Sequence, residues 1–80
     1  MRLDKYLKVS RLVKRRPVAN ELCDAGHVEV NGKTARASLE VKAGDVLTLS
    51  IGARKTKVRV LTVAEYATKE NAAGMFEIME

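Results

Sequence analysis

The sequence is poor in the features on which small secreted domains and membrane proteins depend. Its 80 residues include one cysteine, Cys23, which cannot form an internal disulfide, so we expect a protein of the reducing cytoplasm. No apolar run approaches the length of a membrane span, and the closely spaced charges of the first residues exclude the apolar region of a signal peptide. We therefore expect no membrane partner.

Catalytic and metal-binding constellations are also lacking. Cys23 and His27 are four residues apart, but two ligands do not make a zinc site, and the sequence has no other cysteine or histidine. It has no glycine-rich phosphate loop, and no pair of acidic residues marks a shared site. We expect a protein that is not an enzyme and holds no metal or cofactor, with Cys23 buried and His27 exposed.

Aromatic residues are few, namely two tyrosines, one phenylalanine and no tryptophan. Proteins that bind single-stranded nucleic acid usually stack successive bases on several aromatic side chains, and Tyr6 is better explained as a residue of the core. The composition therefore disfavours the reading of unpaired bases and favours recognition of folded RNA by its shape and backbone.

What the sequence does have is positive charge concentrated at one end. Fifteen Lys and Arg against ten Asp and Glu give a net charge of +5. Seven of these basic residues, with one acidic residue, fall within residues 1–20 and predict a polyanion-binding surface there. A merely solvated face is the alternative, but so many like charges repel one another and are seldom gathered without a partner. The basic residues are Arg2, Lys5, Lys8, Arg11, Lys14, Arg15 and Arg16.

Periodicity predicts two short helices in this basic segment. Apolar residues between Leu3 and Val13 recur at the helical period. A second helix is expected to begin at about Pro17 and to stop at Gly26. Within the first helical pattern, one basic stripe is predicted to contain Lys5, Lys8, Arg11 and Arg15.

Strand signals follow the helices. Val28 to Val30 alternates apolar and polar residues before Asn31-Gly32, a strong signal for a tight hairpin turn. A second hairpin is expected from Val46–Ile51 and residues 55–63, with Gly52-Ala53-Arg54 between them. On its returning strand, one face is predicted to carry a secondary basic patch, made of Lys55, Lys57 and Arg59.

The last residues are ambiguous by pattern alone. Residues 68–74 fit one or two helical turns, and residues 75–78 fit an edge strand.

Three motifs together resemble the S4 (S-four) RNA-binding domain over about residues 1–50. They are R-L-D-x-x-L from Arg2, G-x-V-x-V-N-G from Gly26 and V-K-x-G-D from Val41. The resemblance implies an α+β fold with an alpha-L motif, in which two short N-terminal helices pack on a small, mainly antiparallel β-sheet. It also implies that these helices and their connecting turn lie against RNA. We expect a single domain over 1–80, with the core motif at about 1–50 and a hairpin and short tail at 51–80.

Within that family the chain resembles small stand-alone members that act in bacterial ribosome quality control. The resemblance rests on residues 8–12, on Lys14-Arg15-Arg16 and on an alanine-rich acidic tail. It implies binding to 23S rRNA on large ribosomal subunits obstructed by peptidyl-tRNA and contact with that tRNA. It also implies assistance to the tailing factor RqcH, which adds alanine tails to stalled nascent chains without a template. We expect the protein to be a monomer.

Carried over residue by residue, the family's RNA-facing positions are Arg2, Asp4, Lys5, Arg11, Arg15 and Arg16, with Lys8 beside them. Arg16 is the first choice, because a place in the turn between the helices would leave it free to reach a phosphate. Asp4 is expected either to order Arg2 or Lys8 or to complement the positive end of the first helix.

Other functions compete with this reading. A heat-shock-type S4 protein, which recycles free large subunits with trapped nascent chains, is the nearest rival, although the acidic end at Glu80 argues against it. A generic module for structured RNA is a second alternative. A DNA-binding helix pair ranks lower, because the arginines are expected in the turn rather than along a recognition helix. Enzymes that carry fused S4 domains need a catalytic domain for which 80 residues leave no room.

Overall fold

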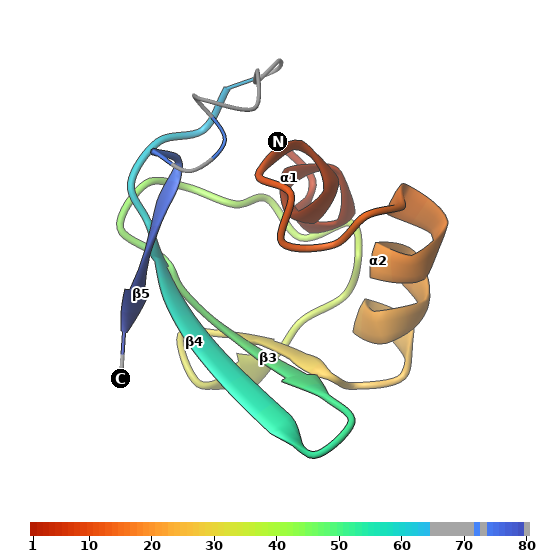
Figure 1. Ribbon diagram of the computed structural model, residues 1–80. Coiled ribbons are helices and arrows are strands. Elements are labelled where there is room, and N and C mark those ends of the chain that lie inside the picture. The colour runs from red at the N-terminus through yellow and green to blue at the C-terminus, as the bar shows by residue number, and fades with distance from the viewer. Residues whose placement is uncertain (65–71, 73, 80) are drawn as a thin grey trace.

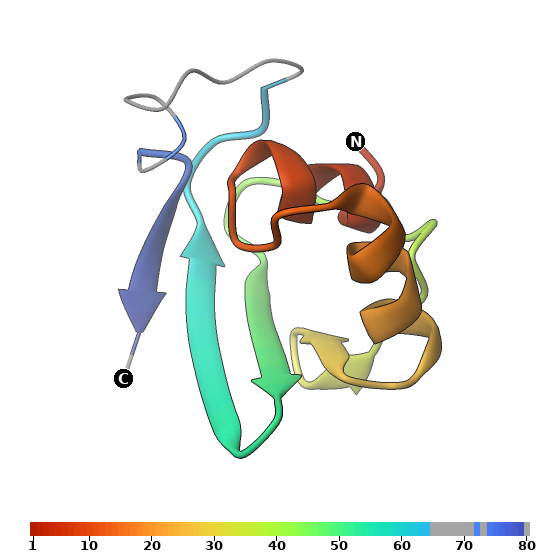
Figure 2. The same cartoon turned by 45° about the vertical axis from the view of Figure 1, so that its right-hand side comes forward.

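A computed structural model describes residues 1–64, 72 and 74–79 of the chain. In this part of the chain two helices precede five strands, which form one antiparallel sheet in the order β2-β1-β3-β4-β5 (Figure 1). Both helices lie on the same face of the sheet (Figure 2). The predicted α+β fold is thereby confirmed. The elements are α1 (Leu3–Val9), α2 (Arg16–Asp24), β1 (Val28–Val30), β2 (Lys33–Thr34), β3 (Val46–Ile51), β4 (Arg54–Val60) and β5 (Phe76–Met79).

One apolar core lies between the helices and the sheet. Alternate strand residues point into it, as a period of two requires, so that Leu47 and Leu49 are buried beside Val58 and Val60. Tyr6 is fully buried and donates a hydrogen bond from its hydroxyl to the carbonyl oxygen of Met75, at 2.9 Å. The prediction that Tyr6 belongs to the core is confirmed. This bond ties α1 to the residue just before β5.

The first helix is shorter than its apolar pattern predicts. It ends at Val9 because Arg11 adopts a left-handed backbone conformation, with φ of 64°. The N–H of Arg11 donates to Lys8 O at 3.1 Å, and the N–H of Val13 donates to Leu7 O at 3.0 Å, which closes the helix end. Val13 is still buried, but from the connecting segment and not from the helix.

The predicted single basic stripe is therefore wrong. Lys5 and Lys8 lie on α1, Arg11 lies in the left-handed turn, and Arg15 is the residue that precedes α2. The second helix begins at Arg16, one residue before the predicted Pro17. It is followed by Gly26 in the predicted left-handed conformation, with φ of 82°.

The two hairpins form as predicted, with small differences at their ends. Asn31 and Gly32 have φ of 53° and 85°, and the positive values suit the turn type that joins β1 to β2. The side chain of Asn31 accepts a hydrogen bond from the N–H of Val46 at 3.0 Å, which fixes this turn to the start of β3. Gly52 and Ala53 join β3 to β4, which ends at Val60 and not at the predicted residue 63.

The predicted edge strand near the C-terminus is also present. It runs from Phe76 to Met79 as β5 and pairs with β4. The predicted helical turns at residues 68–74 lie almost entirely outside the described residues. Neither α1 nor α2 is long or apolar enough to cross a lipid bilayer.

Candidate nucleic-acid interface

The basic residues of the N-terminal segment come from three pieces of backbone: α1 with the residue before it, the segment that connects the helices, and the first residue of α2. Strand β1 and the 37–41 segment hold the helices in place; for example, the N–H of Leu3 donates to Leu39 O at 2.8 Å. Lys5 is half-buried, and the other six basic side chains are exposed. We call this set the helical basic surface. It consists of Arg2, Lys5, Lys8, Arg11, Lys14, Arg15 and Arg16.

A buried carboxylate lies beneath this surface. Asp4, in the first turn of α1, is 2% exposed. It accepts hydrogen bonds from Arg2 Nε at 3.2 Å and from the Lys5 N–H at 2.8 Å. On α2, the Asn20 amide donates a hydrogen bond to Asp4 at 3.4 Å. Arg16 Nε forms an ion pair with Asp4, also at 3.4 Å. One carboxylate thus joins the N-terminal ends of both helices.

The surroundings of Asp4 keep it ionised at neutral pH. Burial by itself would raise the pKa of Asp4, because a charged carboxylate loses its hydration. Hydrogen bonds from Asn20 and from the Lys5 N–H, together with the positive charge of Arg16, outweigh burial and hold the pKa below its ordinary value. At neutral pH the ionised Asp4 carboxylate therefore holds the two arginines.

The position of Arg16 differs from the prediction. It is the first residue of α2, not a residue of the turn, and Asp4 holds it through Nε. Its side chain remains 46% exposed, which leaves part of the guanidinium accessible to a phosphate. The contact between Asp4 and Arg2 agrees with the prediction that Asp4 orders Arg2.

Sequence reasoning missed Asn20 and the link between Asp4 and Arg16. Asn20 lies one turn after Arg16 on α2, so both side chains reach the same part of α1. The spacing of Arg16 and Asn20 is visible in the sequence, but it does not show which residue of another helix they meet.

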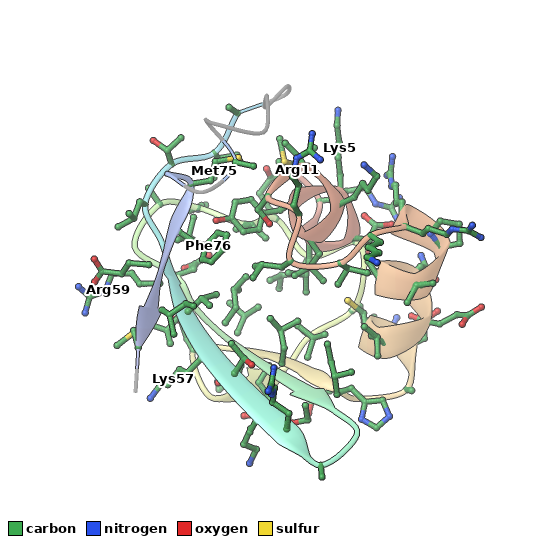
Figure 3. All side chains as sticks on the ribbon, viewed as in Figure 1. Lys5, Arg11, Lys57, Arg59, Met75 and Phe76 are labelled. Carbon is green, nitrogen blue, oxygen red and sulfur yellow. The ribbon has the colours of Figure 1, made fainter. Side chains whose placement is uncertain are left out.

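The secondary basic patch lies on the opposite side of the sheet. Because Val58 and Val60 point into the core, their neighbours on β4 point outward. Figure 3 shows Lys57 and Arg59 projecting from β4, far from Lys5 and Arg11 at the α1 end. Arg59 forms an ion pair with Glu77 on β5 at 3.4 Å, which neutralises one of the three charges.

Cys23 and His27 do not form a common site. The helix ends at Asp24, and Cys23 is buried while His27 is exposed, as predicted. Burial, with the negative charges of Asp4 and Asp24, raises the pKa of the Cys23 thiol to about 11. Among the described residues no group of three or more potential metal ligands occurs.

Comparison with known proteins adds independent information. Residues 1–47 match the family model described as the S4 domain. The RQC P-site tRNA stabilizing factor of Streptococcus pneumoniae is 48% identical over 79 residues, covering 99% of this chain and 90% of that protein. The factor of the same name from Bacillus subtilis is 48% identical over 80 residues, covering 100% of this chain and 93% of that protein.

A solved structure shows the same architecture. The heat shock protein 15 of Vibrio cholerae superimposes with a TM-score of 0.91 at 26% sequence identity, covering 99% of this chain and 81% of that chain. The similarity therefore extends through the second hairpin and β5, beyond the residues that the family model matches.

Proposed function

The chain belongs to the S4 domain family, and from this premise we propose that it is a non-catalytic RNA-binding factor of cytoplasmic ribosome quality control. In this role it binds the 23S rRNA of large ribosomal subunits obstructed by peptidyl-tRNA and contacts that tRNA. It thereby assists RqcH in the template-independent alanine tailing of stalled nascent chains. The 48% identity to P-site tRNA stabilizing factors over nearly the full chain supports this proposal.

The tie between Asp4 and the two arginines is the observation that carries the proposal. A guanidinium offers five N–H donors, and Asp4 occupies only some of those on Arg2 and Arg16. Because Asp4 restricts both side chains before RNA arrives, less conformational entropy is lost when they meet phosphates. The surrounding lysines and arginines add long-range attraction for the RNA backbone.

The heat-shock-type reading remains the second candidate, because heat shock protein 15 shares the fold. The Vibrio cholerae protein is 26% identical to this chain and a heat shock protein 15 homologue of Aeromonas salmonicida is 35% identical over 65 residues, against 48% for the tRNA stabilizing factors. We therefore favour the role in tailing over the recycling of free large subunits.

Co-sedimentation tests the proposal directly. Purified protein is mixed with separated small and large subunits, with and without peptidyl-tRNA, across a salt series. We expect selective retention on large subunits that carry peptidyl-tRNA, falling steeply with salt as phosphate contacts are lost. Equal retention by both subunits, or by any RNA duplex, would leave only a generic RNA-binding module.

A matched pair of variants tests which surface binds. The Arg16 and Arg59 side chains are 46% and 47% exposed, and each has a carboxylate at 3.4 Å. Arg16→Ala is expected to weaken binding by about 1–3 kcal/mol with the fold intact, as for a lost charge-assisted phosphate contact. Arg59→Ala is the control, because Glu77 already neutralises the Arg59 charge, and is expected to bind normally. Equal losses would show that the helical basic surface contributes no more to binding than the outer face of the sheet.

The proposed link to RqcH has a separate test. Tail synthesis is reconstituted with RqcH, alanyl-tRNA and obstructed large subunits, with and without the protein. We expect longer alanine tails when it is present and no such gain with Arg16→Ala. Tails of equal length with and without the protein would remove the tailing role while leaving RNA binding in place.

A further inference from the structure

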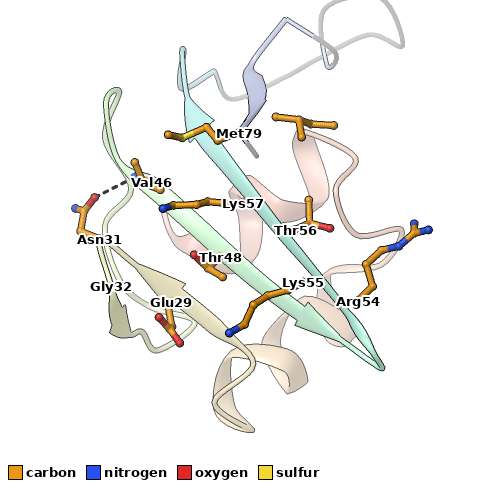
Figure 4. Close-up of a pocket in the computed structure, with 11 residues that line it drawn as sticks. Glu29, Asn31, Gly32, Val46, Thr48, Arg54, Lys55, Thr56, Lys57 and Met79 are labelled. Carbon is orange, nitrogen blue, oxygen red and sulfur yellow. Dashed lines mark hydrogen bonds between the residues drawn. The ribbon is translucent and has the colours of Figure 1, made fainter.

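The outer face of the sheet, opposite the helices, carries its own polar surface. Across the strands, Glu29, Thr48 and Lys57 are successive neighbours, and Ser50 faces Lys55. Figure 4 shows Thr48, Lys55 and Lys57 on this face, with Glu29 on β1 beside them. They line an open hollow of about 1110 Å³, which also includes Val46 and Met79.

This face carries both positive and negative side chains, and Glu29 lines the same hollow as Lys55 and Lys57. The cations lie on β4, Glu77 lies on the neighbouring edge strand β5, and Glu29 lies on β1, with β3 between β1 and β4. Glu77 is paired with Arg59. Among the described residues, no acidic group comes within ion-pair distance of Lys55 or Lys57.

The two lysines face hydroxyl groups on the neighbouring strand. Lys55 is directly opposite Ser50, and Lys57 is directly opposite Thr48. We call these four residues the outer lane. Both lysines are exposed, and both hydroxyl residues are partly exposed. Ammonium and hydroxyl groups side by side are typical donors to phosphate oxygens.

We propose that the outer lane binds the phosphodiester backbone of a second RNA segment, so that the protein bridges two segments. This inference rests on the proposed function, in which the helical basic surface binds the first. Lys55 and Lys57 are two residues apart on a strand, or about 6.8 Å, which is comparable to the separation of successive phosphates along an RNA strand. An RNA strand along β4 therefore meets both lysines.

The outer lane recognises the backbone of the RNA and not its bases. Of the aromatic side chains that the structure describes, Tyr6 is buried in the core and Phe76 packs against it. Neither is placed to stack a base on the outer lane. An acidic protein segment would also meet the lysines, but the spacing of Lys55 and Lys57, about 6.8 Å, suits successive phosphates of an RNA strand. Protein crosslinks from position 57 would identify such a segment instead.

The helical basic surface and the outer lane are too far apart for one straight RNA segment to contact both. The molecule measures 28 × 27 × 22 Å along its principal axes, and the sheet and core separate the helical basic surface from the outer lane. A single RNA backbone that lies on the helices therefore does not reach Lys57. The two segments belong either to two RNA molecules or to two distant parts of one.

Site-specific crosslinking decides between one and two RNA contacts. A photoreactive benzoylphenylalanine replaces Lys14 in one sample and Lys57 in another, and each is irradiated on large subunits that carry peptidyl-tRNA. We expect both positions to crosslink RNA, and sequencing to place the crosslinks on different segments, which also identifies each as rRNA or tRNA.

The outcomes separate this inference from the proposed function. RNA crosslinks from position 14 combined with protein crosslinks or none from position 57 would overturn the outer lane and leave the proposed function standing. Crosslinks from both positions to one segment would overturn bridging. Absence of RNA crosslinks from position 14 would count against the proposed interface, whatever position 57 shows.

Binding measurements give an independent readout. The double variant Lys55→Gln/Lys57→Gln is expected to lower retention on obstructed large subunits by about tenfold and to reduce the salt slope. Lys55→Arg/Lys57→Arg keeps both charges and is expected to bind normally. Lys42→Gln, at an exposed lysine outside both surfaces, is the matched control. An equal loss in the control, or none in the double variant, would overturn the outer lane.

Discussion

Two arginine–carboxylate pairs lie on opposite faces of the molecule, and they have the same distance and nearly the same exposure of the arginine side chain. The pair of Arg16 with Asp4 and the pair of Arg59 with Glu77 both measure 3.4 Å, and the arginine side chains are 46% and 47% exposed. The carboxylates differ sharply, since the Asp4 side chain is 4% exposed and the Glu77 side chain is 52% exposed.

This difference decides what each pair does. A buried carboxylate is costly unless hydrogen bonds replace its hydration, and Asp4 receives them from both helices. Its position is therefore fixed, and it fixes Arg16 in turn. In the exposed pair of Arg59 and Glu77, water competes for both charged groups, and salt screens their attraction. The role of an exposed arginine therefore depends on whether its carboxylate partner is buried or exposed.

Removal of each carboxylate is the strongest test of this contrast. Asp4→Ala is expected to lower the free energy of unfolding by about 2–3 kcal/mol, because it leaves the Lys5 N–H and the Asn20 amide without their acceptor. Glu77→Ala is expected to change it by less than about 0.5 kcal/mol. Urea denaturation measures both values, and similar losses in the two variants would contradict the contrast.

Arginine-to-lysine substitutions examine the same contrast in RNA binding. A lysine at position 16 keeps the charge, but its single ammonium cannot hold Asp4 and present a planar fork to a phosphate. Arg16→Lys is therefore expected to weaken binding to obstructed large subunits by about 1 kcal/mol, whereas Arg59→Lys is expected to have no effect. Normal binding by Arg16→Lys would show that position 16 contributes charge alone.

Much of the fold could be predicted because its signals are local. Asn31-Gly32 predicts its own turn, and the alternation along β4 places Val58 inside and Lys57 outside. The end of α1 could not be predicted. Val13 continues the apolar pattern but is buried from a non-helical segment, and Arg11 is not a residue type that usually takes a left-handed conformation.

The basic residues of the candidate site can be picked out from the sequence, but Asn20 and the organisation of the site cannot. Charge density alone indicates which residues form the helical basic surface. The contact of Asp4 with Arg16 and Asn20 joins two helices across residues that are distant in the sequence. Its geometry depends on how α1 packs against α2, and no spacing within one helix encodes that packing.

Acid titration gives a smaller effect with a defined sign. The folded pKa of Asp4 lies below its ordinary value, so the ionised group stabilises the fold above about pH 4. This contribution is lost as pH falls through the folded pKa. The difference in unfolding free energy between the wild type and Asp4→Asn is therefore expected to shrink below about pH 4. A difference that stays constant from pH 7 to pH 3 would contradict this assignment.

The smallest expected effect is the coupling between Arg59 and Glu77. These residues are direct cross-strand neighbours on β4 and β5, a position in which opposite charges contribute about 0.2–1 kcal/mol. Because both side chains are about half exposed, solvent screening reduces this value, and a double-mutant cycle is expected to give a coupling below about 0.5 kcal/mol. The same cycle on Arg16 and Asp4 is expected to give more than about 1 kcal/mol, because one partner is buried. Equal couplings would mean that burial of the carboxylate does not distinguish the two pairs, and that Arg16 is no better held than Arg59.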